Sequence, residues 1–204
     1  SRFNQDQLFQ ALEGMIQGIV IHRGKALYAN PAMIELVGLA SREDYMRAPS
    51  VIDFVHPEDQ ALVRYQSQRR IQTGETQSYE FRLSRPDGSW IWVDSRASSI
   101  MWDGEPAAMA VLTDISARKR TELLFHSVFH STPDAITLSG MDDLRYVLVN
   151  DSFLRLHAMR LEDVVGRTAQ EIGLTVEPPF RPRLAEMLRN GEEVRDIVTE
   201  IRGE

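Results

Sequence analysis

Residues 86–93 read "PDGSWIWV", a turn followed by two tryptophans one residue apart. Alternate side chains of a strand point to opposite faces, so Trp90 and Trp92 share one face and Ile91 and Val93 share the other. Both faces of this strand are therefore apolar. Burying two tryptophans removes roughly 400 Å² from water, worth at most about 10 kcal/mol, so we expect both faces to be covered.

The turn joins two strands of a longer meander. The segments "QSYEFRLS", "SWIWVDSRASSI" and "PAAMAVLTDIS" alternate in polarity and are separated by the turns "RPDG" and "WDGE". Asp-Gly turns between such runs are typical of β-hairpins. A helix over residues 57–73 precedes the meander, because Pro57 suits a first helical position, Glu58 and Asp59 suit the positive end of the helix dipole, and Gly74 suits its end.

The chain contains a repeat. "LFQALEGMIQGIVIHRGKALYANPAMIELVGL" and "LFHSVFHSTPDAITLSGMDDLRYVLVNDSFLRLHAM" share one pattern, in which an apolar helix is followed by two short strands and a second helix. The second strand ends in Asn30 in one copy and in Asn150, 120 residues later, in the other. The spacing predicts two units of similar length and the same fold.

These elements resemble a PAS sensory domain in its PAS/PAC form, and the resemblance spans nearly all of both repeats. It rests on the order of the elements, on "HPED" before the long helix, on "PDGSWIWV" and on "TDISARKR" after the last strand. It implies an α+β fold with a five-stranded antiparallel sheet in the order 2-1-5-4-3. Short helices on one face would enclose a small pocket, and the other face would pack on the amino-terminal helix or on a second protomer.

We predict two domains, a PAS domain with an amino-terminal helix over residues 1–118 and a linker helix with a second PAS domain over 119–204. The final segment "EEVRDIVTEIRGE" corresponds to "ETQSYEFRLSRPDG" of the first repeat. We therefore expect the second domain to stop before its last two strands, as in a fragment of a longer protein or one whose tail was lost. The helix "PPFRPRLAEMLRNG" is shorter and richer in proline than its counterpart.

The alternation of the strands assigns residues to the pocket. Ser95 is the main polar group expected on the inner face, and Tyr65, Arg64 or Gln68 of the long helix would add a polar contact. A packed core without ligand is the alternative. The predicted pocket residues are Tyr65, Leu83, Ile91, Val93, Ser95, Ala110 and Leu112.

The outer face, with Trp90 and Trp92, is expected to be covered by a helix over residues 5–16 or by a partner subunit. Apolar stripes on this helix and on the linker helix suit pairing between protomers, and packing on their own sheets is the alternative. The predicted interface residues are Phe9, Leu12, Ile16, Trp90, Trp92, Leu124 and Val128.

A relay is expected where "TDISARKRTELLFHSVFHS" leads from the last strand into the linker helix without a flexible linker. The resemblance implies that Asp114 pairs with Arg118 or Arg120 and that this pair ties the sheet to the helix. The alternative is an aspartate that caps the helix.

Composition excludes several function classes. The net charge of −7 disfavours nucleic acid and anionic membranes as partners, and no apolar run is long enough to span a bilayer. The absence of cysteine suits a cytoplasmic protein. No nucleophile, zinc-protease or phosphate-loop motif occurs, so we expect no catalytic and no metal site.

The cofactor is unknown. Without cysteine, covalent flavin photochemistry is excluded, and the absence of histidine from the long helices disfavours haem. His126 and His130 share a helix face without an evident third metal ligand, and His56 is expected to cap or pack.

These observations predict a non-catalytic sensory and dimerisation segment of a bacterial signalling protein. The resemblance implies a histidine kinase or a cyclic-di-GMP enzyme as output. The segment is expected to form a homodimer and to relay small-molecule, redox or partner signals through the inter-domain helix. The alternative is a ligand-free dimerisation and protein-interaction spacer.

Overall fold

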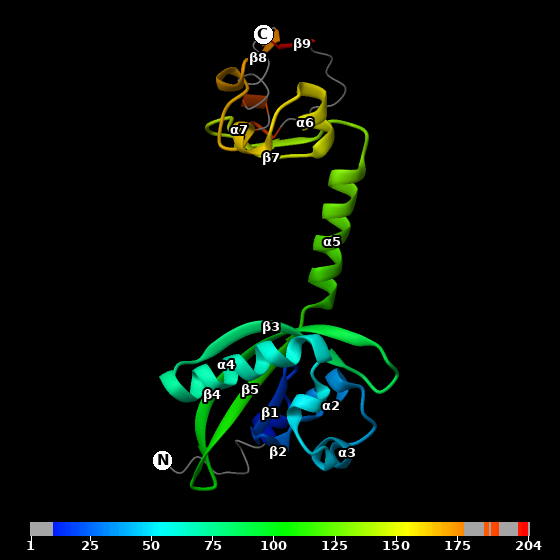
Figure 1. Ribbon diagram of the computed structural model, residues 1–204, viewed down its shortest axis with the longest axis vertical. Coiled ribbons are helices and arrows are strands. Elements are labelled where there is room, and N and C mark those ends of the chain that lie inside the picture. The colour runs from blue at the N-terminus through cyan, green and yellow to red at the C-terminus, as the bar shows by residue number, and fades with distance from the viewer. Residues whose placement is uncertain (1–9, 178–185, 188, 192–199, 204) are drawn as a thin grey trace. The chain divides into compact units, whose positions relative to one another are not determined.

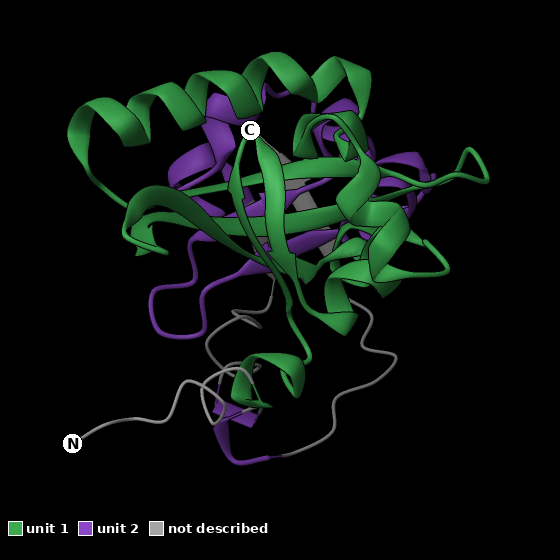
Figure 2. Ribbon diagram, turned by 90° about the horizontal axis from the view of Figure 1, so that it is seen from below, with its two compact units in different colours: residues 1–121 green, residues 122–204 purple. Residues whose placement is uncertain are grey.

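The computed structural model describes residues 10–177, 186–187, 189–191 and 200–203. The chain divides into two compact units, Ser1–Thr121 and Glu122–Glu204 (Figure 2). Phe9, the beginning of the helix expected over residues 5–16, and most of "PPFRPRLAEMLRNG" lie outside the described residues.

Unit 1 contains a five-stranded antiparallel sheet. Its strands lie in the order β2-β1-β5-β4-β3, which confirms the predicted order 2-1-5-4-3. The turn "RPDG" connects β3 and β4, and Gly88 adopts there a φ of +83° that favours glycine. The strands are β1 (Gly18–Arg23), β2 (Lys25–Ala29), β3 (Gln77–Ser84), β4 (Trp90–Trp102) and β5 (Glu105–Asp114).

Helices cover the inner face of this sheet, and the longest of them, α4, lies along β3 and β4 (Figure 1). Gly18 allows β1 to approach α2 closely, since a Cβ atom at this position would lie 3.2 Å from the Cα of Met33. The predicted helix 57–73 is divided into a 3₁₀ turn and α4. The helices are α2 (Pro31–Val37), α3 (Arg42–Arg47), η1 (Val51–Phe54), η2 (Pro57–Asp59) and α4 (Gln60–Thr73).

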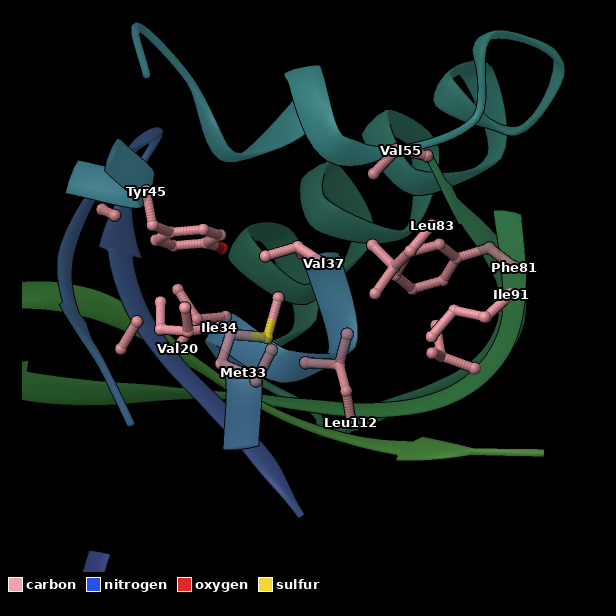
Figure 3. Close-up of a cluster of buried hydrophobic side chains, with 14 of the residues drawn as sticks. Val20, Met33, Ile34, Val37, Tyr45, Val55, Phe81, Leu83, Ile91 and Leu112 are labelled. Carbon is pink, nitrogen blue, oxygen red and sulfur yellow. The ribbon is translucent and has the colours of Figure 1, made fainter. Parts of the chain in front are cut away.

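The main core of unit 1 lies between these helices and the sheet. Figure 3 shows Val20, Met33 and Tyr45 toward one end of this cluster and Phe81 and Leu83 toward the other. A second, smaller cluster contains Ile19, Ile21, Tyr28 and Ala107, with Leu12 packed against it. Since Ile19 and Ile21 alternate with Val20, this second cluster lies on the outer face of the sheet.

Unit 2 repeats the beginning of unit 1. Its described residues hold the antiparallel pairs β6–β7 and β8–β9 and a core around Tyr146, Phe153 and Val164. The strand β8 was not predicted. The elements after β5 are α5 (Ser116–Ser131), β6 (Thr137–Ser139), β7 (Tyr146–Val149), α6 (Asp151–His157), α7 (Leu161–Val164), η3 (Gln170–Ile172), β8 (Leu174–Glu177) and β9 (Glu200–Gly203).

A fully buried asparagine organises each unit. The Oδ1 atom of Asn30 accepts hydrogen bonds from the backbone of Ile19 and Met33, and its Nδ2 atom donates to the carbonyls of Leu12 and Gln17. This one side chain therefore joins the amino-terminal helical turn, β1 and the start of α2.

Asn150 makes the same set of bonds in unit 2. Its Oδ1 atom accepts from the backbone of Ile136 and Phe153, and its Nδ2 atom donates to the carbonyls of Phe129 and Asp134. The repeat seen in the sequence thus extends to individual hydrogen bonds.

Candidate functional site

A cavity of about 340 Å³ lies within unit 1, between the inner face of the sheet and the helices. Its volume is at the lower end of the range of about 300–1,000 Å³ that is typical of small-molecule sites. Its apolar lining comes from the strands, from α2, α3, η1 and α4 and from the residue after η1. It consists of Val20, Met33, Tyr45, Val51, Ile52, Val55, Val63, Phe81, Leu83, Ala97, Ala110 and Leu112.

The structure places four of the seven predicted pocket residues in this lining: Leu83, Ser95, Ala110 and Leu112. Ile91 and Val93 lie on the inner face, as the alternation predicts, but they belong to the packed core rather than to the cavity lining. Their cross-strand neighbours Leu83 and Phe81 line the cavity, whereas Ile91 and Val93 do not, so their assignment to the pocket is corrected.

Tyr65 is also corrected, since its side chain is 58% exposed and does not line the cavity. The helical period of 3.6 residues gives the physical reason. Arg64, Ser67 and Gln68 lie three and four residues apart on the face of α4 that lines the cavity, and Tyr65 points away from that face.

Five further polar side chains line the cavity and were not predicted: His22, Ser50, Ser67, Arg70 and Tyr79. Arg70 follows Arg69 directly in the sequence, and only the phase of α4, counted from Val63, could have distinguished the buried arginine from the exposed one. His22 and Tyr79 are on β1 and β3, where alternation places them beside Val20 and Phe81 on the inner face.

Burial sets the ionisation of these groups. It lowers the pKa of His22 to about 4, and the nearby Arg70 guanidinium lowers it further. Burial raises the pKa of the Tyr79 phenol and lowers that of Arg70. At pH 7, His22 and Tyr79 are therefore neutral, whereas Arg70 remains a cation.

The "HPED" motif connects α4 to the sheet. Asp59 accepts hydrogen bonds from the backbone and the guanidinium of Arg82, and this pairing lowers the pKa of the Asp59 carboxyl. His56 is the residue before η2, and its Nδ1 atom accepts a bond from the backbone of Glu58.

The two tryptophans lie on the outer face, and the cover that the described residues give them comes from basic side chains. Trp92 is partly buried under the Arg82 guanidinium and the Lys119 ammonium group, whereas Trp90 is 47% exposed. Both groups come from unit 1 itself, because Arg82 is the cross-strand neighbour of Trp92 and α5 begins just after β5. Cover of Trp90 by a partner subunit stays a prediction.

The start of α5 is attached to β3 and β4. Glu80 forms ion pairs with Arg118, at 2.6 Å, and with Lys119, at 2.5 Å, and these pairs lower the pKa of the Glu80 carboxyl. The backbone N–H of Ile115 donates to the carbonyl of Trp92. The Ser116 hydroxyl in turn accepts from the N–H of Trp92.

The predicted relay pair is wrong. Asp114 accepts a hydrogen bond from the backbone of Ser116 at the start of α5, which is the capping alternative. Arg118 reaches Glu80 instead, and Arg120 is exposed. The acidic residue that ties the sheet to α5 is therefore Glu80, on a strand distant in sequence.

The predicted interface residues fall into different environments. Leu12 packs on the outer-face cluster of its own sheet, and Ile16 follows the helical turn and is 97% exposed. Ile16 is therefore no part of a helical stripe. Leu124 and Val128 are exposed on α5, together with Leu123 and Phe125.

The histidine pair of α5 has a polar neighbour. The rings of His126 and His130 lie 4.4 Å apart, and the Nδ1 atom of His130 is 3.0 Å from the Asp151 carboxylate. Among the described residues, no three His, Cys, Asp or Glu side chains are grouped so as to hold a metal ion.

Within the same residues, no helix combines the length and apolarity needed to cross a membrane.

Comparison with known proteins gives the same assignment for both halves of the chain. Residues 26–112 match a family model described as "PAS fold", and residues 133–204 match one described as "PAS domain". The PAS domain of a protein from Colwellia psychrerythraea is similar in structure, with 21% identity and a TM-score of 0.49 over 56% of this chain and 98% of that one.

Two histidine kinases are similar in sequence. Sporulation kinase A of Bacillus subtilis (strain 168) is 25% identical over 71% of this chain and 25% of its own length. A blue-light-activated histidine kinase of Brucella anthropi is 27% identical over 73% of this chain and 35% of its own length. The chain thus spans between a quarter and about a third of these relatives. From the two family matches, the chain belongs to the PAS domain family and carries two PAS domains in tandem.

Proposed function

We propose that this chain is the sensory segment of a histidine kinase, in which the cavity of unit 1 binds a small molecule and α5 transmits its presence. The observation that carries the proposal is the cavity with a mixed apolar and polar lining. The similarity to two histidine kinases supports the kinase as output. A cyclic-di-GMP enzyme is the alternative output. The proposed location is the cytoplasm, which the absence of cysteine suits.

A path from the cavity to α5 runs through β4. Ser95 of this strand lines the cavity, and Trp92, three residues earlier, faces outward and holds Ser116 through its backbone. A ligand that displaces β4 thereby acts on the first turn of α5. The pairs of Glu80 with Arg118 and Lys119 hold that turn in the present position.

Native mass spectrometry of the freshly purified protein, with a denatured control and a visible spectrum, tests the binding step. We expect an additional mass that is released on denaturation. Ala110→Phe, which fills the cavity, should abolish the additional mass, and Ala117→Phe, on the exposed start of α5, should not. Protein without additional mass in any preparation would overturn the sensory proposal and favour a spacer.

A second role, dimerisation, is favoured by the exposed apolar side chains of α5. Leu123, Leu124, Phe125 and Val128 are all exposed over less than two helical turns. Monomeric proteins rarely leave such a group in water, so we propose that it pairs with a second copy of the chain.

Sedimentation equilibrium tests the dimer. We expect the wild-type chain to dimerise and Leu124→Glu with Val128→Glu to weaken dimerisation at least tenfold. Arg120→Glu, an exposed change on the same helix, serves as the control for added charge. A monomeric wild type, or a double variant as dimeric as the control, would contradict the assignment.

A further inference from the structure

Arg70 is a buried cation that has no counter-ion among the described residues. It lies in the last turn of α4, is 4% exposed and lines the cavity. Its Nη2 atom donates to the Ser67 hydroxyl at 3.1 Å, but its Nε atom has no hydrogen-bond partner. Buried guanidinium groups are normally paired, because leaving such a charge uncompensated is costly.

Within the part of the chain that the structure describes, no negative charge faces this group. The described residues that line the cavity include Arg64 and Arg70 but no aspartate or glutamate. The ionisable neighbours of Arg70 are His22 and Tyr79, and burial keeps both neutral at pH 7, since it lowers the pKa of His22 and raises that of Tyr79. The described part of the chain gives Arg70 no ion pair.

A neutral side chain cannot replace a counter-ion here. The Oε1 atom of Gln66, one turn earlier on α4, is also without a hydrogen-bond partner. A bond from the Nε atom of Arg70 to this amide would satisfy both atoms and leave the positive charge uncompensated. By contrast, the Arg82 guanidinium of the same unit is paired with Asp59 and Glu58.

We propose that the cavity binds a small carboxylate, whose oxygens pair with the Arg70 guanidinium while its apolar part contacts Val20, Met33 and Leu112. This inference rests on the proposed sensory function and names its ligand class. The planar fork of an arginine matches the two oxygens of a carboxylate. The volume of the cavity also suits a small carboxylate. Its apolar lining around a single buried charge favours a ligand with one anionic end.

Matched pairs of acids and amides test the ligand class. Benzoate and hexanoate are compared with benzamide and hexanamide, and binding is followed by isothermal titration and by the thermal transition of tryptophan fluorescence. All three tryptophans belong to unit 1, so this signal reports on the unit that contains the cavity. We expect the acids to bind and to raise the transition temperature, and the amides to bind at least tenfold more weakly.

Arg70→Met removes the charge and keeps an unbranched apolar side chain, and Arg69→Met is the exposed control on the same helix. We expect Arg70→Met to weaken acid binding at least tenfold and Arg69→Met to change it less than twofold. Without ligand, Arg70→Met should be at least as stable as the wild type, because it replaces an uncompensated buried charge. A marked loss of its stability would indicate a structural role for Arg70 and overturn the inference.

The remaining outcomes separate the inference from the proposed function. If acids and amides bind equally well, or if Arg70→Met binds acids as the wild type does, the carboxylate assignment fails and a ligand-binding cavity remains. An additional native mass that proves to be an uncharged compound would have the same consequence. If none of the four probes binds and purified protein carries no additional mass, the inference and the sensory proposal both fail.

Discussion

The two units begin with the same hydrogen bonds, but they differ in how deeply their first strand pair is buried. Asn30 and Asn150 each bond to two N–H groups and two carbonyls at equivalent positions. The strand pairs that follow have the same register, with Ile21 opposite Tyr28 and Leu138 opposite Leu148. Local sequence is therefore sufficient to specify this start.

The burial of those equivalent pairs is opposite. Ile21 is 1% exposed in unit 1, whereas Leu138 is 54% exposed in unit 2. In unit 1, β5 pairs with β1 and adds Ala107, Met109 and Val111 to the same outer-face cluster. Nearby residues therefore specify the first strand pair of each unit. The strand that buries this pair in unit 1, β5, lies more than eighty residues later in the chain.

The largest expected effect comes from a charge placed on each member of the equivalent pair. Ile21→Asp should destabilise unit 1 by at least about 4 kcal/mol, because it buries an unpaired carboxylate. Leu138→Asp should change stability by less than about 1 kcal/mol. Urea unfolding followed by tryptophan fluorescence reads unit 1, and far-UV circular dichroism reads both units. Equal effects of the two changes would contradict the difference in covering.

The asparagines test the similarity of the units. Asn30→Ala should cost about 3–5 kcal/mol, since it leaves two buried N–H groups and two carbonyls without their partner. Asn150→Ala should cost a similar amount in unit 2 and leave the tryptophan transition in place.

Asn190→Ala, an exposed asparagine of unit 2, is the control for these changes. If Asn150→Ala shifts the tryptophan transition as much as Asn30→Ala does, the two units do not unfold independently. The comparison between them would then have to be made on the whole chain.

The buried histidines make the stability of each unit depend on pH. The folded pKa of His22 is about 4, below its unfolded value of 6.5, so the unfolded state binds the proton first as pH falls. Stability from this group is present above about pH 6.5 and decreases toward pH 4, with a loss of roughly 2 kcal/mol between pH 7 and pH 5.

We therefore expect His22→Gln to reduce the dependence of the unit 1 unfolding midpoint on pH between 7 and 5. Burial also lowers the pKa of His157 in unit 2, so His157→Gln should affect circular dichroism and leave the tryptophan midpoint unchanged. The Asp59 carboxyl, whose pKa is lowered by Arg82, titrates below this window. An unchanged pH dependence in His22→Gln would show that other groups produce it.

The smallest effect is expected at the attachment of α5. Glu80→Gln removes the partner of Arg118 and Lys119, and partly exposed ion pairs contribute about 0–1 kcal/mol. We expect stability to change by less than about 1 kcal/mol, while the emission of Trp92 shifts because Lys119 is no longer held over its ring. A loss above about 2 kcal/mol would make this contact part of the folding core of unit 1.

Much of unit 1 could be predicted because its signals are local. The two faces of β4, the turn at Gly88 and the positions of β3 and β5 follow from alternation and turn residues. Tyr65 and the proposed pair of Asp114 with Arg118 were wrong, because the phase of α4 against the sheet and the reach of Arg118 to Glu80 depend on packing between distant segments.

The sequence by itself determined the repeat, the succession of helices and strands along the chain and the helix that begins directly after Asn30 and Asn150. These depend on periodicity and on local turn and cap residues, whereas the strand order within the sheet was expected from the resemblance to PAS domains. Only the tertiary structure decided which arginine of the Arg69–Arg70 pair is buried, what covers Trp92 and which acid holds α5. Those features depend on contacts between residues of separate strands and helices, and a local sequence pattern does not specify such contacts.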